Sequence, residues 1–227
     1  MKAAVFHRSG LPLSIEHIAD PEPGPNHMIL KVCACGICGT DLHWSEVNND
    51  ESDWRDINPG AVMGHEFAGE IVEVGRNVTD WRVGQRVLCD PVDRVGGGGL
   101  MGEMWHGGLA EYCKVPTHHL VLLPDSVSFE QASCLPVAYG TAYRMMYTIG
   151  NVQEGNRVLI LGASGGVGTC AVRLAKARGC EVIACASSEE KLQRLGDIGA
   201  DHGINYVEEE FHKWVYNQYG KPHRRRW

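Results

Sequence analysis

Arg157-Val158-Leu159-Ile160-Leu161-Gly162-Ala163-Ser164-Gly165-Gly166-Val167-Gly168 joins an apolar run to a glycine-rich segment. The apolar half predicts a strand that is covered on both faces, as in a parallel sheet. The glycines open a helix that we expect to run to about Arg178 and to end at Gly179. A glycine fingerprint between a strand and a helix is the context in which such a motif binds a dinucleotide.

Two more strand–helix pairs are expected after this stretch. The expected elements are a strand at 181–186, a helix at 188–195 capped by Ser188, a strand at 202–206 and a helix at 208–219. The order βαβαβα is one half of a doubly wound, or Rossmann, parallel-sheet domain. We assign residues 127–227 to it, including a helical region at 129–149 that Pro136 should end or kink.

The preceding residues, 1–126, are expected to form a β-rich domain. Alternating segments at 29–32, 70–75 and 86–89 are separated by turn-forming sequence such as Pro21-Glu22-Pro23-Gly24-Pro25. Many short strands with this punctuation indicate a β architecture. The fold class is therefore α/β plus β, in two domains.

Composition excludes several classes of function. With 227 residues, 44% of them hydrophobic, the chain is long enough for real cores, and a net charge of −7 argues against a nucleic-acid partner. No apolar run is long enough to span a membrane, and the polar N-terminus does not resemble a signal peptide. Nine dispersed cysteines favour reduced thiols and metal ligands over disulfides, so we expect a cytoplasmic location.

The segments Cys38-Gly39-Thr40-Asp41-Leu42-His43 and Gly64-His65-Glu66 combine a thiolate, an imidazole and a carboxylate. This ligand mix is typical of a catalytic Zn²⁺ that keeps a fourth position open. A redox pair at Cys35 and Cys38 is the alternative, but no thioredoxin-like helix is evident there. Neighbouring ligands at 65 and 66 require irregular backbone, because successive side chains of a regular strand point to opposite faces.

Together with Gly107-Gly108-Leu109-Ala110-Glu111-Tyr112 and the glycine fingerprint, these segments resemble the zinc-dependent alcohol dehydrogenase branch of the medium-chain dehydrogenase/reductase superfamily. The resemblance covers nearly the whole chain, from Met1 to about His202. It implies a GroES-like catalytic domain followed by the Rossmann half, a small-molecule alcohol or carbonyl substrate, and a homo-oligomer in the full-length form.

The resemblance also assigns zinc ligands. Cys38 and His65 match two of them, and Glu66 is expected to be the third, because Val137 occupies the position where many relatives have a cysteine and Cys134 is out of register. A second, structural zinc would need four cysteines near residues 89–113. Only two are present, so we expect one catalytic ion and no structural zinc.

The resemblance also assigns Thr40 and His43, together with Glu66, to catalysis and Asp41 to the support of a ligand. Asp41 matches the carboxylate that orients the ligand histidine, although an aspartate can also simply form a turn. Thr40 matches the hydroxyl that contacts the substrate oxygen, and His43 the outer member of a proton relay.

The expected cofactor is NADP(H). Gly165 and Gly168 should let the pyrophosphate approach backbone N–H groups at the helix N-terminus. Ala163 stands at the first fingerprint glycine, as in quinone reductases of the superfamily. Cofactor contacts are assigned to Thr141, Gly162, Ala163, Gly165, Gly166, Val167, Gly168, Ser187, Ser188 and Lys191.

The preference for the phosphorylated cofactor comes from the end of the second strand. An NAD site has an acidic residue there, whereas this chain has Ala186-Ser187-Ser188. These serines and Lys191 could receive a 2′-phosphate. The alternative is that Lys191 and Arg194 only solvate the helix.

A Rossmann domain needs two halves, and the sequence given ends at Trp227 after one of them. We therefore expect a truncated chain with an unpaired edge strand at 157–162, weak nucleotide binding and little turnover. Three interpretations remain: a zinc-dependent alcohol or aldehyde/ketone oxidoreductase or a fragment of one; a zinc-free NADPH:quinone or enone reductase; and a zinc- or nucleotide-binding remnant without activity.

Overall fold

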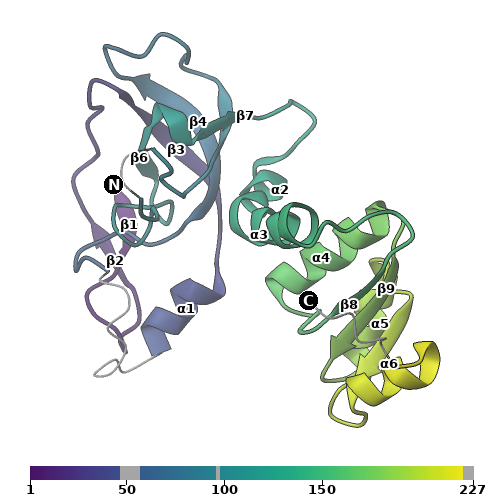
Figure 1. Cartoon of the computed structure of the whole chain (residues 1–227). Helices are drawn as coiled ribbons and strands as arrows, with labels where there is room; N and C mark the ends of the chain where they lie inside the picture. The colour runs from purple at the N-terminus through teal and green to yellow at the C-terminus, as the bar shows by residue number, and fades with distance from the viewer. Residues whose placement is uncertain (47–56, 96–97, 222–227) are drawn as a thin grey trace. The chain divides into compact units, whose positions relative to one another are not determined.

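The computed structural model describes residues 1–46, 57–95 and 98–221. The chain divides into two compact units, Met1–Val137 and Ala138–Trp227 (Figure 1). Helix α2 (Phe129–Ser133) packs against β3, β4 and β5 of the first unit. The first unit therefore extends past residue 126 and includes a helix that the sequence placed with the nucleotide-binding half.

The first unit is built on an antiparallel sheet in the order β6-β3-β4-β5-β7. Its strands are β3 (His27–Gly36), β4 (Glu66–Val74), β5 (Arg86–Cys89), β6 (Tyr112–Pro116) and β7 (Leu120–Leu122). A separate antiparallel pair, β1 (Lys2–Val5) and β2 (Ser14–His17), lies beside it. Alternate side chains of the sheet form a closed core that includes Met28, Leu30, Phe67 and Ile71. The β-rich architecture expected for this part of the chain is confirmed.

The long strand β3 is irregular, and this positions the candidate site. Its pairing with β4 shifts register between Ile29 and Leu30 and again between Val32 and Ala34. Such bulges bend a strand and increase its twist. Beyond the end of β3 the chain enters helix α1 (Gly39–Glu46). The segment from 35 to 43 is thereby carried over the start of β4.

The helical region expected at 129–149 is present but is not one continuous α-helix. After α2 come a π-helical turn η2 (Leu135–Tyr139), helix α3 (Gly140–Tyr143) and a second π-helical turn η3 (Arg144–Ile149). The ring of Pro136 and its missing N–H prevent regular α-helical bonding at this position, so the expected break is confirmed. Ser128 caps α2 in a reciprocal capping box with Gln131.

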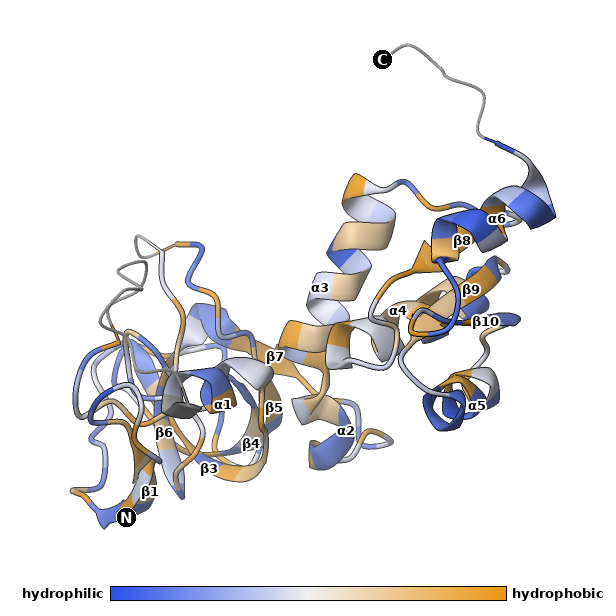
Figure 2. Cartoon of the chain, turned by 90° about the horizontal axis from the view of Figure 1, so that it is seen from below, coloured by the Kyte–Doolittle hydropathy of each residue, from blue (hydrophilic) through white to orange (hydrophobic). Residues whose placement is uncertain are grey.

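The second unit is a parallel sheet in the order β10-β9-β8 with helices on both faces. Its elements are β8 (Arg157–Ile160), α4 (Gly166–Ala177), β9 (Glu181–Ala186), α5 (Glu189–Asp197), β10 (His202–Asn205) and α6 (Phe211–Tyr219). The side chains of β9 alternate between two cores. Val182 and Ala184 pack with α3 and α4, whereas Ile183 and Cys185 pack with α6. Figure 2 shows β8 and β9 as predominantly hydrophobic and α5 as predominantly hydrophilic. The βαβαβα half of a Rossmann fold is confirmed.

Within the described residues, β8 pairs only with β9 and forms one edge of this sheet. Leu159 on this strand is 36% exposed and Leu161, just after it, is 58% exposed. Within the described residues, the second unit therefore has the apolar edge strand that the sequence predicts.

Candidate metal and nucleotide sites

Cys38, His65 and Glu66 come together in the first unit although the first two lie 27 positions apart along the chain (65 − 38). One ligand atom from each lies within 4.8 Å of the others. Cys38 lies between β3 and α1, while His65 and Glu66 lie at the start of β4. His65 and Glu66 are buried, and Cys38 is half-buried, so the group is open on the thiol side.

Gly64 produces the irregular backbone that two neighbouring ligands require. Its φ is +94°, which residues with a side chain rarely adopt. A Cβ at this position would also lie 2.7 Å from Leu109 Cγ and 2.9 Å from Cys35 Sγ. Because the chain turns here before β4 begins, His65 and Glu66 both reach Cys38.

Asp41 ties the two halves of the group together. Its Oδ2 accepts a hydrogen bond of 2.9 Å from the backbone N–H of Cys38, and its Oδ1 lies 3.9 Å from Nδ1 of His65. Asp41 and His65 are 3% and 1% exposed, and within the described residues these two facing atoms have no hydrogen-bond partner. Burying unsatisfied polar atoms is costly. A metal on the remaining nitrogen of His65 would fix Nδ1–H toward Asp41, so the residues fit a zinc ion.

The protonation of the three ligands is coupled. A hydrogen bond with His65 is the main cause that lowers the pKa of the Cys38 thiol, and Thr40 acts in the same direction. Burial favours the neutral ring of His65, but the bond with Cys38 and the charge of Asp41 outweigh it and raise the pKa of His65. Burial raises the pKa of Glu66. The interaction with His65 thus favours the thiolate of Cys38, the form in which cysteine binds a metal.

The two residues assigned to proton transfer lie in one turn of α1. Thr40 Oγ1 is 3.6 Å from the Cys38 sulfur and Thr40 is half-buried. His43 lies three positions later, on the same side of the helix, and is exposed. The helix thus places a hydroxyl beside the candidate metal group and an imidazole at solvent.

Other cysteines are placed differently. Cys134 is exposed and its thiol donates to the carbonyl of Glu130, and it is not part of the Cys38 group. Cys89 and Cys113 are buried in the core of the sheet, where burial raises the pKa of both thiols. They are packed as small apolar side chains.

The glycine loop of the second unit has the geometry of an anion site. Gly165 precedes the first residue of α4, and its carbonyl accepts the first helical bond, from Thr169 N–H. The N–H groups of Gly166, Val167 and Gly168 consequently have no acceptor inside the helix. Anions bind at such helix N-termini.

Gly168 also has a packing role, which is the role of the third glycine in a dinucleotide fingerprint. A Cβ here would lie 2.4 Å from the carbonyl oxygen of Gly162 and 2.7 Å from Cα of Ala163. Its missing side chain is therefore required for close packing of α4 on the loop, whereas a Cβ at Gly165 meets only Gly162, at 3.4 Å. Of these two glycines, only Gly165 leaves its Cβ direction open toward a ligand.

The residues assigned to a 2′-phosphate lie together after β9. Lys191 Nζ donates to Ser187 Oγ at 2.9 Å, and Ser188 caps α5 by accepting from the backbone N–H of Lys191. Thr141 lies in α3 of the same unit and is exposed. The residues after β9 thus form one polar group, and Thr141 lies on a different element.

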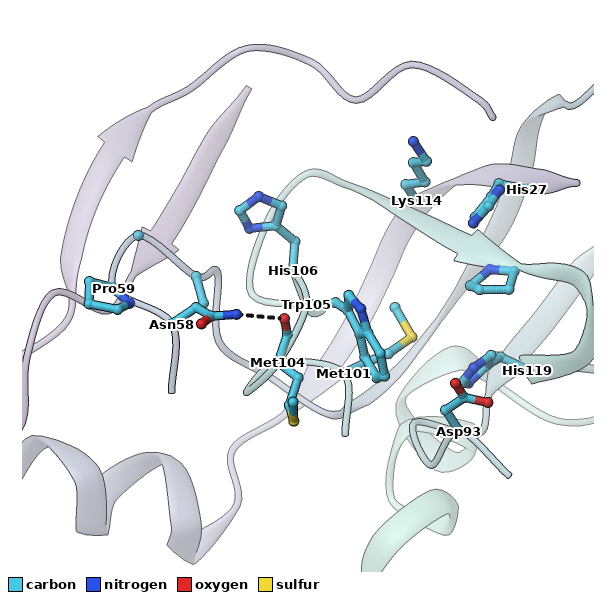
Figure 3. A pocket seen from close by; sticks show the side chains of 13 residues that line it. His27, Asn58, Pro59, Asp93, Met101, Met104, Trp105, His106, Lys114 and His119 are labelled. Atoms are coloured by element: carbon cyan, nitrogen blue, oxygen red, sulfur yellow. Dashed lines mark hydrogen bonds between the residues drawn. The ribbon is translucent and has the colours of Figure 1, made fainter. Parts of the chain in front are cut away.

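The first unit also has a cavity of about 580 Å³ that Cys38, His65 and Glu66 do not line. Its walls include Met101, Trp105, His119 and Asp93 (Figure 3). The sequence assigns no role to His118, His119 or Asp93. The histidines follow the aspartate by 25 or more positions (118 − 93), so no local motif connects them. The adjacency of the two histidines is the one local signal.

Comparisons with known proteins agree with both units. Residues 24–125 match the alcohol dehydrogenase GroES-like domain, and residues 166–223 match the zinc-binding dehydrogenase family. An alcohol dehydrogenase of Geobacillus stearothermophilus is 33% identical over 98% of this chain and 69% of its own length. An NAD-dependent alcohol dehydrogenase of Sulfolobus acidocaldarius is 35% identical over 92% of this chain and 65% of its own length.

A solved structure described as a quinone oxidoreductase of Pseudomonas syringae is also similar. It has a TM-score of 0.80 and 30% identity, covering 96% of this chain and 62% of that one. The chain thus spans about two thirds of the length of the relatives it matches. The fold and these matches identify the chain as a zinc-binding dehydrogenase of the medium-chain dehydrogenase/reductase superfamily. Within it, the chain belongs to the alcohol dehydrogenase branch and is an alcohol-dehydrogenase-like oxidoreductase.

No helix among the described residues is long and apolar enough to cross a bilayer.

Proposed function

We propose that Cys38, His65 and Glu66 bind one catalytic Zn²⁺ and that the chain belongs to an enzyme that transfers a hydride between NADP(H) and an alcohol, aldehyde or ketone. The observation that carries the proposal is the convergence of these three ligand atoms within 4.8 Å. The buried carboxylate of Asp41 behind His65 supports it, because ligand histidines are held by such partners. When bound, the zinc ion supplies Lewis acidity to the substrate oxygen and the nicotinamide carries the hydride.

The residues around the group supply proton transfer. The Thr40 hydroxyl, 3.6 Å from the Cys38 sulfur, can receive or donate the proton of an alcohol held there. His43, exposed one turn further along α1, passes that proton to or from solvent. Glu66 is the third ligand because Cys134 lies apart from the group.

The preference for NADP(H) rests on the chemistry after β9. Ser187 and Lys191 present a hydroxyl and an ammonium 2.9 Å apart, where an NAD-specific site has a carboxylate. A phosphate accepts hydrogen bonds from both groups, and the charge of Lys191 strengthens them.

A zinc-free quinone or enone reductase is the second candidate. Ala163 at the first fingerprint position and the similarity to a quinone oxidoreductase favour it. It leaves the Cys38, His65 and Asp41 arrangement without a role. The two functions differ in metal content and in substrate class.

The decisive experiment compares the zinc content of the purified chain with that of two cysteine variants. Cys38→Ala should lose one zinc per chain, and Cys33→Ala, an exposed cysteine on β3, should lose none. NADPH oxidation is then measured with aldehydes and with enones. Equal zinc content in the wild type and Cys38→Ala, with reduction of enones, would establish the second candidate instead.

A further inference from the structure

We propose that Asp93, His118 and His119 form a second metal site, which binds a first-row transition-metal dication such as Zn²⁺ and ties the loop after β5 to the turn before β7. The site is independent of the proposed catalytic group and shares no residue with it. It also differs from the four-cysteine zinc site that the sequence excludes, since none of its ligands is a thiol.

The three residues already have the spacing of a coordination shell. One ligand atom from each lies within 4.8 Å of the others, and Nε2 of His118 is 3.3 Å from Oδ1 of Asp93. Two ligands bound tetrahedrally at about 2.0–2.1 Å lie about 3.3–3.4 Å apart. The His118–Asp93 distance therefore matches one edge of a zinc tetrahedron.

His119 is held in the form that binds a metal. Its Nδ1 is in hydrogen-bond contact with the backbone carbonyl of Asp90. Because a carbonyl only accepts, Nδ1 carries the proton, and Nε2 presents its lone pair. The side chain is 3% exposed. A ligand histidine whose second nitrogen is fixed by a carbonyl is the usual arrangement in metal sites.

The fold brings the two segments together. Cys89 pairs with Leu120 where β5 meets β7, and the Asp90 N–H donates to the His119 carbonyl at 2.7 Å. His118 and His119 lie in the 3₁₀ turn η1 (Thr117–His119), so their rings share one side, with centroids 4.5 Å apart. In a strand they would point to opposite faces.

The carboxylate is buried and oriented. Asp93 is 8% exposed, and its Oδ1 accepts the backbone N–H of Val95 at 2.9 Å. In Figure 3 the Asp93 carboxylate lies beside the His119 ring at one end of the cavity. The cavity of about 580 Å³ provides room for water at the remaining coordination position. Two imidazoles and one carboxylate favour zinc, nickel or copper over magnesium or calcium.

Cobalt(II) titration of the full chain tests the proposal. In a variant that lacks the catalytic group, Cys38→Ala with His65→Ala, one Co²⁺ per chain should still bind at micromolar concentration. Its spectrum should contain d–d bands without thiolate charge transfer, since no cysteine belongs to this site. Adding His118→Ala should weaken binding by more than about 100-fold, because even the loss of a residue that only supports a ligand costs 10- to 100-fold.

His17→Ala is the matched control, because it removes an exposed histidine of β2 in the same unit. It should leave Co²⁺ affinity unchanged. Asp93→Asn is the second test variant, since asparagine can still accept the Val95 N–H but is a poor metal ligand. Circular dichroism reports whether each variant is folded.

The proposal is overturned if the variant without the catalytic group binds no Co²⁺, or if folded His118→Ala and Asp93→Asn proteins bind it as tightly as their parent. Failure of the proposed catalytic site looks different. In that case the wild-type chain shows no thiolate-to-cobalt charge transfer, whereas binding that depends on His118 persists.

Discussion

Gly168, in the first turn of α4, offers a sharp test of how the nucleotide loop is built. An alanine Cβ would lie 2.4 Å from the Gly162 carbonyl oxygen and 2.7 Å from Ala163 Cα. Both are backbone atoms, so the contact is relieved only by moving the loop or the helix. Overpacking of this kind costs about 1–3 kcal/mol.

Gly166 is the matched control, since it lies in the same turn and is exposed, and a Cβ there meets nothing within 4 Å. Both substitutions gain helix propensity, about 0.5–1 kcal/mol for glycine to alanine. This gain cancels when the two variants are compared. The difference between their free energies of unfolding is therefore the packing cost alone, about 1–3 kcal/mol.

Urea unfolding followed by circular dichroism measures this difference. We expect Gly166→Ala to be slightly more stable than the wild type and Gly168→Ala to have the lowest midpoint of the three. For a unit of this size, 1 kcal/mol corresponds to about 4–8 °C in Tm. If Gly168→Ala is as stable as Gly166→Ala, the loop does not pack as described.

Three further predictions concern the second unit. Gly165→Ala should fold normally, because its Cβ meets only Gly162, at 3.4 Å. Fluorescence titration should nevertheless show markedly weaker NADPH binding. Unchanged binding would contradict the proposed position of the pyrophosphate. Lys191→Ala should weaken NADPH binding about 5- to 10-fold and change NADH binding little. The loss corresponds to about 1 kcal/mol, as expected for an exposed ion pair. Calorimetry with both nucleotides measures the ratio of the two affinities. Asp201→Asn should destabilise the unit by about 1 kcal/mol at pH 7, a value reduced for exposure, because the Lys176 ammonium and the Val182 N–H lower the pKa of Asp201. Since the pKa of Asp201 is lower in the folded than in the unfolded state, this stability is present above about pH 4 and is lost as the pH falls through the folded pKa. The free energies of unfolding of the wild type and Asp201→Asn, measured in urea, should therefore converge in acid.

Much of the second unit could be predicted because its signals are local. The apolar run at 157–160, the glycines that open α4 and the serine that caps α5 act within a few residues of one another. The limits of β9 were predicted without error, because the segment is short and turn-forming residues flank it on both sides.

The features that the sequence missed depend on distant contacts. Helix α2 belongs to the first unit because it packs on strands that lie 40 or more residues earlier (129 − 89). Asp93 meets His118 and His119 only because β5 pairs with β7.

The catalytic group could be predicted only in part. The ligand types could be taken from the segments around Cys38 and His65, and the resemblance supplied their roles. That neighbouring residues 65 and 66 could both reach one metal required Gly64 at a φ of +94°, which the sequence permits but does not specify.

Zinc K-edge X-ray absorption of the His118→Ala protein, loaded with one equivalent of Zn²⁺, tests the central claim most directly. This variant lacks a ligand of the proposed second site, so the spectrum reports the Cys38 group. We predict one sulfur at about 2.3 Å together with nitrogen and oxygen ligands at about 2.0–2.2 Å, and loss of the sulfur shell in Cys38→Ala. A spectrum without sulfur, or one with two or more sulfur ligands, would contradict the assignment of Cys38, His65 and Glu66 as the zinc site.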